Sequence, residues 1–316
     1  MAFQRKSPVV QGGGAPVPLH GGQQSSPLKG LLPDIVEASG DIAAPTILAR
    51  GASGTGKTTG IAQILERLGQ RDERFLLVDV ENKAQSLLRY NPLVLSIGGP
   101  VKDRATGALR RPTNKERYGR LWEFVDKLSA GAYREFNGKP IAGLAGDGLM
   151  EVGDVFYNYF HENMPTSNRT GEQNTFAMFL EMGDRLLDFV AAIKEAASMA
   201  SAMYGARPLA QYWTCGEEEV QDKLGNYTGA FKLVSRGKVA PRRMAFMFEA
   251  IFRLTVERGA DGAANYVCWT VGAEHEFEAK APGSLFAPKV EAWNMGVMFE
   301  QLEQWYKGSS VTSSST

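Results

Sequence analysis

The sequence of 316 residues predicts an α/β fold with a mainly parallel, twisted sheet and helices on both of its faces. Short apolar runs alternate along the chain with longer amphipathic segments, which is the pattern of strands joined by crossover helices. A glycine-rich loop joins the first of these strands to the first helix. The composition, 43% hydrophobic and 22% charged, is that of a globular chain able to bury a sizeable core.

The two ends of the chain differ in composition from the part between them. Residues 1–40 are rich in Gly, Pro, Gln and Ser and offer few apolar side chains for burial, so we expect a flexible arm there. Residues 308–316 are mostly Ser and Thr, and we expect a disordered tail. Residues 41–307 contain no linker-like stretch and are therefore predicted to form one domain.

The first strand and helix are the clearest elements. Residues 46–49 are a short apolar run that leads directly into the glycine-rich loop. The segment 58–68 places its apolar side chains on one face, as an amphipathic helix requires. Those side chains are Ile61, Ile64, Leu65 and Leu68.

Two further strands and a helix are expected next. Residues 74–80 are apolar in their middle and are followed by an acidic position, and residues 93–97 form a second apolar run. The segment 115–128 repeats its apolar residues at helical spacing, with Leu121 and Val125 one turn apart.

The second half of the domain continues the alternation. Residues 140–147 are a weaker strand loaded with small side chains, and 178–203 is the longest expected helix. Residues 209–215 are predicted as a strand, followed by an acidic loop at Glu217, Glu218 and Glu219. The segment 245–256 is compatible with a strand or a helix, and 265–271 is predicted as a strand.

Residues 51–58, Gly-Ala-Ser-Gly-Thr-Gly-Lys-Thr, form a complete Walker A loop between a strand and a helix, which is the context that the motif requires. Glycines let backbone N–H groups turn inward, and the helix N-terminus adds its positive dipole end. Lys57 would reach the β- and γ-phosphates, and the Thr58 hydroxyl would bind Mg²⁺. The sequence therefore predicts a site for Mg²⁺ and ATP, with no motif that separates ATP from GTP. The expected phosphate-binding residues are Gly51, Ser53, Gly54, Thr55, Gly56, Lys57, Thr58 and Thr59.

Carboxylates end two of the later strands. Asp79 and Glu81 close the strand that follows the first helix, and Asp147 closes the strand over 140–147. In-line attack on a γ-phosphate needs an oriented water molecule, and a carboxylate at a strand end can hold one.

This order of elements resembles the RecA-like ATPase core, in which a Walker A strand is followed by a strand ending in Asp-x-Glu and then by one ending in Asp. The resemblance implies that Glu81 positions the attacking water and that Asp147 supports Mg²⁺, with Asp79 as the alternative metal ligand. The next strand of that core ends in a polar γ-phosphate sensor, and Thr214 falls at this position.

More narrowly, the chain resembles the compact, phage-encoded RecA-like ATPases of DNA recombination and single-strand annealing. The segments 75–82, 181–184 and 232–243 carry this resemblance. It implies ATP hydrolysis coupled to assembly on single-stranded DNA by a homo-oligomer, either a ring or a filament, in the host cytoplasm.

Two basic windows depart from the overall charge balance of 35 basic and 35 acidic side chains. The window 102–120 contains Arg110 and Arg111. Tyr118 and Trp122 accompany it, and aromatic faces beside cations suit single-stranded nucleic acid. The alternative for such windows is a solvated basic face. The window 232–243 could instead supply a residue to a neighbouring subunit's site. The candidates for this role or for DNA contact are Arg236, Lys238 and Arg242, together with Lys280.

Several alternatives stay open on the sequence alone. Gly143 and Gly146 weaken the strand before Asp147, and Gly148 follows it, so Asp147 could be an ordinary loop aspartate. A nucleotide or small-molecule kinase, with 102–120 as its lid, and a non-hydrolysing, nucleotide-locked assembly module are the two rival functions.

The remaining composition argues against other classes of protein. Cys215 and Cys268 lie inside expected strands, which fits reduced thiols in a cytoplasmic protein. The chain contains no run of about 18 apolar residues, so no membrane-spanning helix is expected.

Overall fold

The computed structural model describes 44–80, 82, 84–163, 174–204, 207–234, 243–259, 261–272, 278–283 and 285–307, with side chains omitted at 199–204. These residues lie in the compact unit Ser39–Thr316. The predicted arm over 1–40 and the predicted tail over 308–316 lie outside the described residues.

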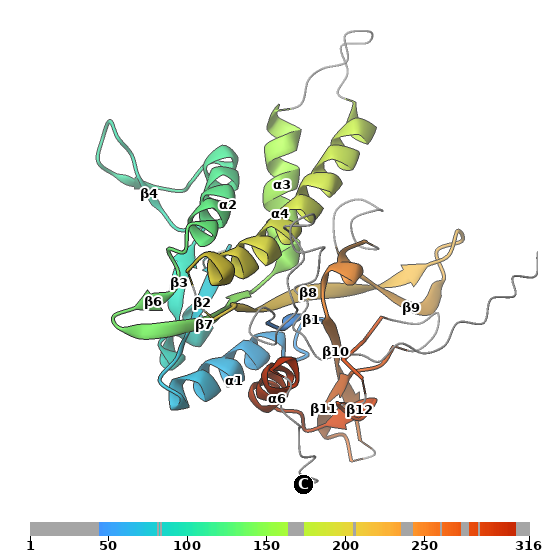
Figure 1. Cartoon of the computed structure of the whole chain (residues 1–316). Helices are drawn as coiled ribbons and strands as arrows, with labels where there is room; N and C mark the ends of the chain where they lie inside the picture. Colours follow the sequence, from blue (N-terminus) through green and yellow to red (C-terminus); the bar gives the residue numbers. More distant parts are fainter. Residues whose placement is uncertain are drawn as a thin grey trace, which may run out of the picture. The chain divides into compact units, whose positions relative to one another are not determined.

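A single mixed sheet forms the centre of the described part (Figure 1). Its main strands lie in the order β12-β11-β10-β1-β8-β7-β2-β3. The strands from β10 to β3 are parallel to their neighbours, whereas β11 and β12 are antiparallel at one edge. The predicted mainly parallel α/β fold is therefore confirmed. The bounds are β1 (Thr46–Gly51), β2 (Arg74–Asp79), β3 (Leu93–Ser96), β7 (Lys139–Gly146), β8 (Ala210–Gln221), β10 (Ala250–Arg258), β11 (Ala264–Trp269) and β12 (Lys289–Glu291).

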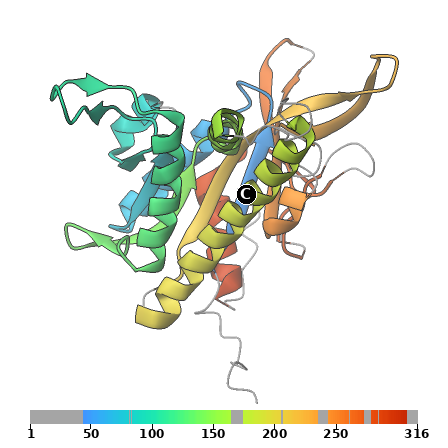
Figure 2. The same ribbon diagram turned by 90° about the horizontal axis from the view of Figure 1, so that it is seen from above.

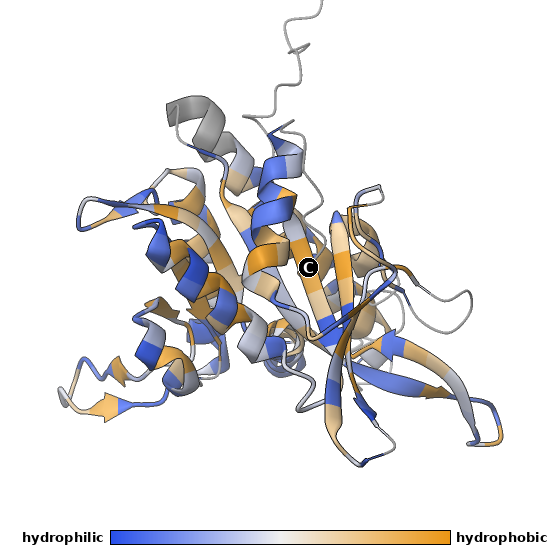
Figure 3. Cartoon of the chain, turned by 90° about the horizontal axis from the view of Figure 1, so that it is seen from below, coloured by the Kyte–Doolittle hydropathy of each residue, from blue (hydrophilic) through white to orange (hydrophobic). Residues whose placement is uncertain are grey.

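Helices cover both faces of this sheet (Figures 1 and 2). On one face α1 (Lys57–Gln70) and α6 (Met295–Tyr306) enclose one buried apolar cluster with the strands. On the other face α2 (Asn114–Ser129), α3 (Leu149–Asn163) and α4 (Thr175–Tyr204) enclose a second cluster. The central strands are mainly hydrophobic (Figure 3), as expected for strands buried on two sides.

Short elements complete the described part of the chain. One 3₁₀ segment follows β2 and another precedes β10. Two short strands form a separate antiparallel hairpin, and a third short strand pairs with the start of β7. A longer antiparallel strand extends β8 outward as a hairpin. These elements are η2 (Ala84–Tyr90), η3 (Ala245–Met247), β4 (Val101–Lys102), β5 (Leu109–Arg110), β6 (Glu135–Phe136) and β9 (Tyr227–Leu233).

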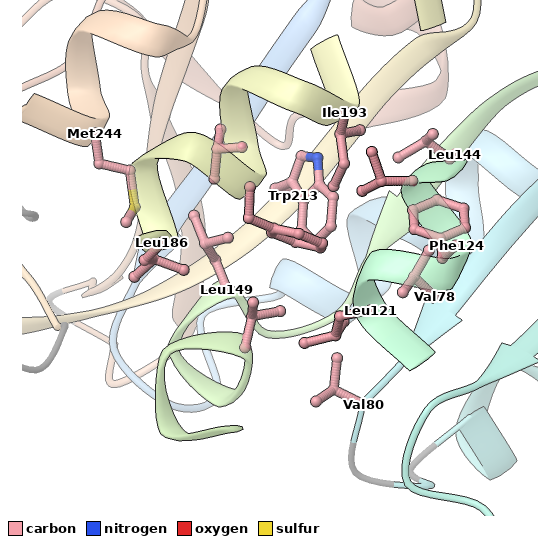
Figure 4. Close-up of a cluster of buried hydrophobic side chains, with 14 of the residues drawn as sticks. Val78, Val80, Leu121, Phe124, Leu144, Leu149, Leu186, Ile193, Trp213 and Met244 are labelled. Carbon is pink, nitrogen blue, oxygen red and sulfur yellow. The ribbon is translucent and has the colours of Figure 1, made fainter. Parts of the chain in front are cut away.

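The glycines that weakened the sequence prediction for β7 have a packing cause. Trp213 of β8 is 1% exposed and lies in the middle of the second cluster (Figure 4). A Cβ atom on Gly146 would lie 2.1 Å from its indole ring, and one on Gly143 would lie 2.3 Å from the Phe75 ring. Because large aromatic side chains from both neighbouring strands cross β7, only glycine fits at these two positions.

Two expectations for individual segments need correction or completion, and two helices were not expected. Glu217, Glu218 and Glu219 do not form a loop, because they continue β8 and pair with β9. The ambiguous segment 245–256 begins with the 3₁₀ turn η3 and then becomes the strand β10. Helices α3 and α6 had no counterpart in the sequence analysis. Among the described helices, none combines the length and the apolar character needed to cross a bilayer.

Candidate functional site

The glycine-rich loop turns sharply between β1 and α1. Every residue of β1 is buried, so the strand fixes the position at which the loop begins. Gly54 and Gly56 have positive φ angles of 80° and 95°, a region that glycine adopts without steric cost. A Cβ atom on Gly51 would lie 2.4 Å from the carbonyl oxygen of Leu254, so this glycine is required by close backbone packing. The Thr55 hydroxyl donates to the Ala52 carbonyl at 2.9 Å, and this hydrogen bond links the two sides of the loop.

Lys57 lies at the start of α1 and folds over the loop. Its Nζ donates to the carbonyl oxygens of Gly51 at 2.8 Å and Ala52 at 2.7 Å. Burial lowers the pKa of Lys57 from its ordinary value of 10.5, and nearby charges, including the Asp147 carboxylate, oppose that shift. An anion in the loop would offer this ammonium group a stronger partner than the two neutral carbonyls.

Three polar side chains from different elements meet beside Lys57. The Thr214 hydroxyl donates to Asp147 Oδ1 at 2.9 Å, and the Thr58 hydroxyl lies 3.2 Å from Asp147 Oδ2. The strands explain this meeting, because Ala49 pairs with Thr214 and Gly146 pairs with Trp213 at the carboxyl edge of the sheet. Ligand sites in parallel α/β sheets occur at this edge.

A cavity of about 770 Å³ opens next to these residues. Its walls come from the loop, from α1, from the turn between β7 and α3 with the first turn of α3, from β11 and from the segment before α6. Of the described residues that line it, Lys57 is the cation, and Asp147 and Glu151 are the carboxylates. The lining residues are Ser53, Gly54, Gly56, Lys57, Thr58, Thr59, Gln63, Asp147, Glu151, Tyr266, Ala292 and Trp293.

Five of these lining residues were missed by the sequence analysis. They are Gln63, Glu151, Tyr266, Ala292 and Trp293. The aromatic pair is brought close to the loop, since a Cβ atom on Gly56 would lie 3.0 Å from the Trp293 ring and 3.8 Å from Tyr266. No local motif marks such residues, because β11 and the segment before α6 reach the loop only through the tertiary fold. Glu151 carried a detectable signal, since it follows the strand-end Asp147 by four positions.

The oxygen donors in the cavity suit Mg²⁺. This ion prefers oxygen ligands and is usually held by one or two carboxylates together with substrate phosphates and water. The Thr58 hydroxyl and the Asp147 carboxylate face each other across about 3.2 Å, and Glu151 lines the same space. Within the described ranges, no cluster of three or more His, Cys, Asp or Glu residues could hold a metal by itself. The donor set therefore fits a metal that arrives with a phosphate ligand.

The other two expected carboxylates are Asp79 and Glu81, of which the structure describes Asp79. Asp79 is 4% exposed at the end of β2, and its Oδ2 accepts the backbone N–H of Ala84 at 3.1 Å. It does not line the cavity, whereas Asp147 does, so the structure gives no support to Asp79 as the alternative metal ligand. Glu81 lies outside the described residues, and its role stays a prediction.

The basic candidates that the structure describes, Arg110, Arg111 and Lys280, lie away from this cavity. Arg110 pairs with Glu116 and Asp103 on an exposed surface. The backbone of Lys280 exchanges hydrogen bonds with that of Ile251. Burial lowers the pKa of the Lys280 ammonium group. Neither Arg110 nor Lys280 lines the cavity. The remaining candidates, Arg236, Lys238 and Arg242, lie outside the described part of the chain.

The aromatic side chains of the first basic window serve the core. The Tyr118 ring stacks on Tyr159 with centroids 4.0 Å apart, and Trp122 packs edge-on against Phe189. Both are partly buried against the second apolar cluster. The expectation that they accompany basic side chains as a platform for bases therefore has no support in their packing.

A second cavity, of about 690 Å³, lies at the carboxyl ends of β2 and β3. Arg111 and Arg117 line it, and Arg117 donates to the Val80 carbonyl at 3.1 Å. Arg120, of the same basic window, instead donates to the carbonyls of Ile97 and Gly99 and fixes the turn after β3. Within the window 102–120, Arg120 therefore has a structural role, whereas Arg111 and Arg117 line this second cavity.

Behind the glycine-rich loop lies a buried ionic cluster. Arg50 of β1 is 0% exposed, and its Nε donates to Glu217 Oε2 at 3.2 Å. The Nε of Arg253, on β10, donates to the same carboxylate oxygen at 3.0 Å. Glu217 therefore bridges cations from the neighbouring strands β1 and β10, which explains why its side chain is only 4% exposed.

Fold and site together define an α/β protein with a glycine-rich loop of Walker A sequence at the carboxyl edge of a mainly parallel sheet. No family model matches the sequence, and no curated protein matches it. Solved structures that match include the KaiC-like protein PH0186 from the archaeon Pyrococcus horikoshii OT3. That match has a TM-score of 0.33 and 14% sequence identity and covers 71% of this chain and 78% of that chain.

Proposed function

We propose that this chain is a RecA-like ATPase that binds Mg²⁺ and ATP in the cavity beside the glycine-rich loop. The observation that carries the proposal is that Lys57 and Thr58 of α1 and Asp147 after β7 line that cavity together, while Thr214 of β8 donates to Asp147. These are the residue types that phosphate and Mg²⁺ require, and their chain order is the one the RecA-like resemblance implies.

Each residue has a distinct task in this proposal. Backbone N–H groups of the loop and the N-terminus of α1 hold the phosphates. Lys57 exchanges its two carbonyl partners for phosphate oxygens, and Thr58 and Asp147 hold the metal side. Mg²⁺, when bound, neutralises charge that develops on the phosphates. Thr214 fixes the Asp147 carboxylate, and Glu81 orients the attacking water.

The proposal includes a homo-oligomer that acts on single-stranded DNA in phage-type recombination or annealing. Of the described residues that line the cavity, only Lys57 carries positive charge, although a triphosphate carries several negative charges. A cation from a neighbouring subunit would supply the additional stabilisation. Arg111 at the second cavity offers a positive surface on the same sheet edge for a DNA phosphate.

One observation favours a second function. A kinase for a nucleotide or small molecule needs a second pocket for its acceptor, and the cavity lined by Arg111 and Arg117 meets that need. The hairpin of β4 and β5 lies between its lining residues Pro100 and Arg111 in the sequence, where a lid would be placed.

Phosphate release from ATP tests these functions together. The purified chain is assayed with and without single-stranded DNA at low and moderate salt. The proposal predicts turnover that DNA stimulates and that loses this stimulation as salt rises, because phosphate contacts weaken with salt. Turnover that requires an added acceptor would instead support the kinase. Nucleotide binding without turnover, even with DNA present, would support a nucleotide-locked assembly module.

A further inference from the structure

Glu151 is a second carboxylate at the cavity. It lies in the first turn of α3, four residues after Asp147, and both residues line the cavity. Residues of the glycine-rich loop line the same cavity, so the two carboxylates share it with the groups expected to bind phosphates. Neither the loop motif nor the RecA-like resemblance assigns a role to a residue at this position.

The Glu151 carboxylate packs against Gly148. A Cβ atom on Gly148 would lie 2.0 Å from Glu151 Oε2 and 2.5 Å from its Cδ. The carboxylate is therefore folded back over the residue that directly follows Asp147. Gly148 has a φ of 111°, which residues with a side chain rarely adopt. The backbone between β7 and α3 is thus shaped so that both carboxylates approach the cavity.

The charges around Lys57 agree with this placement. Asp147, Glu217 and Glu151 each raise the pKa of Lys57, against the larger lowering effect of burial. Glu151 is therefore within electrostatic reach of the ammonium group that would bind phosphate. Without a metal, a carboxylate in this position repels a phosphate ligand.

The hydration of Mg²⁺ suggests a role for the Glu151 carboxylate as a hydrogen-bond acceptor. Asp147 already accepts hydrogen bonds from Thr214 and Thr58. Mg²⁺ keeps several bound water molecules, and those waters need acceptors. Acceptors in this outer layer orient the metal and tune its affinity.

We propose that Glu151 is a positioning residue whose carboxylate accepts hydrogen bonds from water molecules bound to Mg²⁺, and so holds the metal–nucleotide complex against Asp147. This inference rests on the proposed function of the same cavity. It predicts opposite effects of Glu151 on nucleotide affinity in the presence and in the absence of metal.

Equilibrium binding of a fluorescent ATP analogue to the full chain tests the inference, with MgCl₂ titrated in one series and EDTA present in the other. In Glu151→Gln we expect half-maximal binding to require about tenfold more Mg²⁺ than in the wild type. In EDTA the same variant should bind the nucleotide at least as tightly as the wild type, because a repelling charge has been removed.

Two further variants separate this role from a structural one. Glu162→Gln, an exposed position at the other end of α3, is the matched control and should behave as the wild type in both series. Glu151→Asp keeps the charge but withdraws the carboxylate, so it should require more Mg²⁺ without gaining affinity in EDTA. Thermal unfolding checks that each variant is folded, and the aspartate variant carries the test if the glutamine variant is not.

Three outcomes would overturn the inference, each in a recognisable way. An unchanged Mg²⁺ requirement in Glu151→Gln would show that the carboxylate does not act on the metal. An equal loss of affinity with and without Mg²⁺ would show a structural role only. Absence of nucleotide binding in the wild type under every condition would overturn the proposed function itself, and the inference with it.

Discussion

Thr214 illustrates what a single residue does at the candidate site. It is 1% exposed on β8, and its hydroxyl donates to Asp147 Oδ1 at 2.9 Å. Asp147 is held from the other side by the Thr58 hydroxyl. The carboxylate therefore has a fixed direction before any ligand binds, which lowers the cost of arranging the site around a metal and a phosphate.

Removal of this hydroxyl should affect turnover more than binding. Thr214→Val keeps the shape of the side chain and deletes the donor, so we expect kcat for ATP hydrolysis to fall about tenfold or more. Nucleotide affinity should stay near the wild-type value, because the loop and Lys57 are untouched. Thr214→Ser keeps the hydroxyl and should retain most of the activity.

Steady-state phosphate release, together with nucleotide binding, measures the effect. A valine variant with wild-type kcat would contradict the role given to Thr214. The variant should also lose about 0.5–1.5 kcal/mol of unfolding free energy, because the partly buried Asp147 carboxylate loses one hydrogen-bond donor.

At the residue scale, the sequence predicted what is local and missed what the fold brings together. Lys57 and Thr58 were found because the motif and its helix are contiguous in the chain. Tyr266 and Trp293 reach the same cavity from elements more than two hundred residues later, and no local pattern marks them. Asp79 and Asp147 both end strands, and only the sheet order shows that Asp147 lies beside the strand of Thr214.

At the element scale, β7 shows how packing can override strand propensity. Its glycines are unfavourable for an isolated strand. In the sheet they leave space for Trp213 and Phe75, which are each 1% exposed. The low propensity of the strand therefore reflects the size of its neighbours, which the sequence of the strand alone does not contain.

Substitution of Gly146 should disturb the core directly. A methyl group at Gly146 would lie 2.1 Å from the Trp213 ring, so we expect Gly146→Ala to lower the free energy of unfolding by about 1–3 kcal/mol or more. Gly69→Ala in α1 is the matched control, because nothing lies within 4 Å of the added methyl group. That variant should be neutral or more stable by about 0.5–1 kcal/mol.

Urea unfolding followed by tryptophan fluorescence measures both variants. Equal stability of the two alanine variants would contradict the close contact between β7 and Trp213.

The hairpin of β8 and β9 begins in a buried ionic cluster. Three successive acidic residues suggested a solvated loop, because isolated charges are rarely buried. The partners of Glu217 are Arg50 and Arg253, which come from two other strands. The sequence around Glu217 therefore gives no sign of them. Burial lowers the pKa of Arg50, and Glu217 opposes this shift.

Neutralising Glu217 should therefore be costly. Glu217→Gln keeps the side-chain size but leaves two buried guanidinium groups without their carboxylate, and we expect a loss of about 3–5 kcal/mol of unfolding free energy. Glu218→Gln is the control on the next residue of β8, since its side chain is 53% exposed and pairs with Lys232 at the surface. Such exposed pairs contribute about 1 kcal/mol at most.

Chemical denaturation of the two variants, compared with the wild type, distinguishes these cases. If both glutamine variants lost equally little stability, the Arg50–Glu217–Arg253 cluster would not be the stabilising contact described above.

At the scale of the described unit, the alternation of strands and helices was enough to predict a mainly parallel sheet covered on both faces. The antiparallel edge formed by β11 and β12 was not predicted, nor was the hairpin of β8 with β9. These pairings depend on contacts between distant segments, whereas a crossover helix between parallel strands leaves a periodic signal in the chain. The candidate site lies at the carboxyl ends of the parallel strands β1, β7 and β8.

The central claim is that this sheet edge holds a Lys57-dependent site for ATP with Mg²⁺. Its most direct test is equilibrium binding of ATP to the wild type and to Lys57→Ala, with circular dichroism to confirm that both are folded. We expect saturable, Mg²⁺-dependent binding in the wild type and at least a hundredfold loss in the variant, on the order of the loss of a charged hydrogen-bond partner. Wild-type affinity in a folded Lys57→Ala variant would contradict the account.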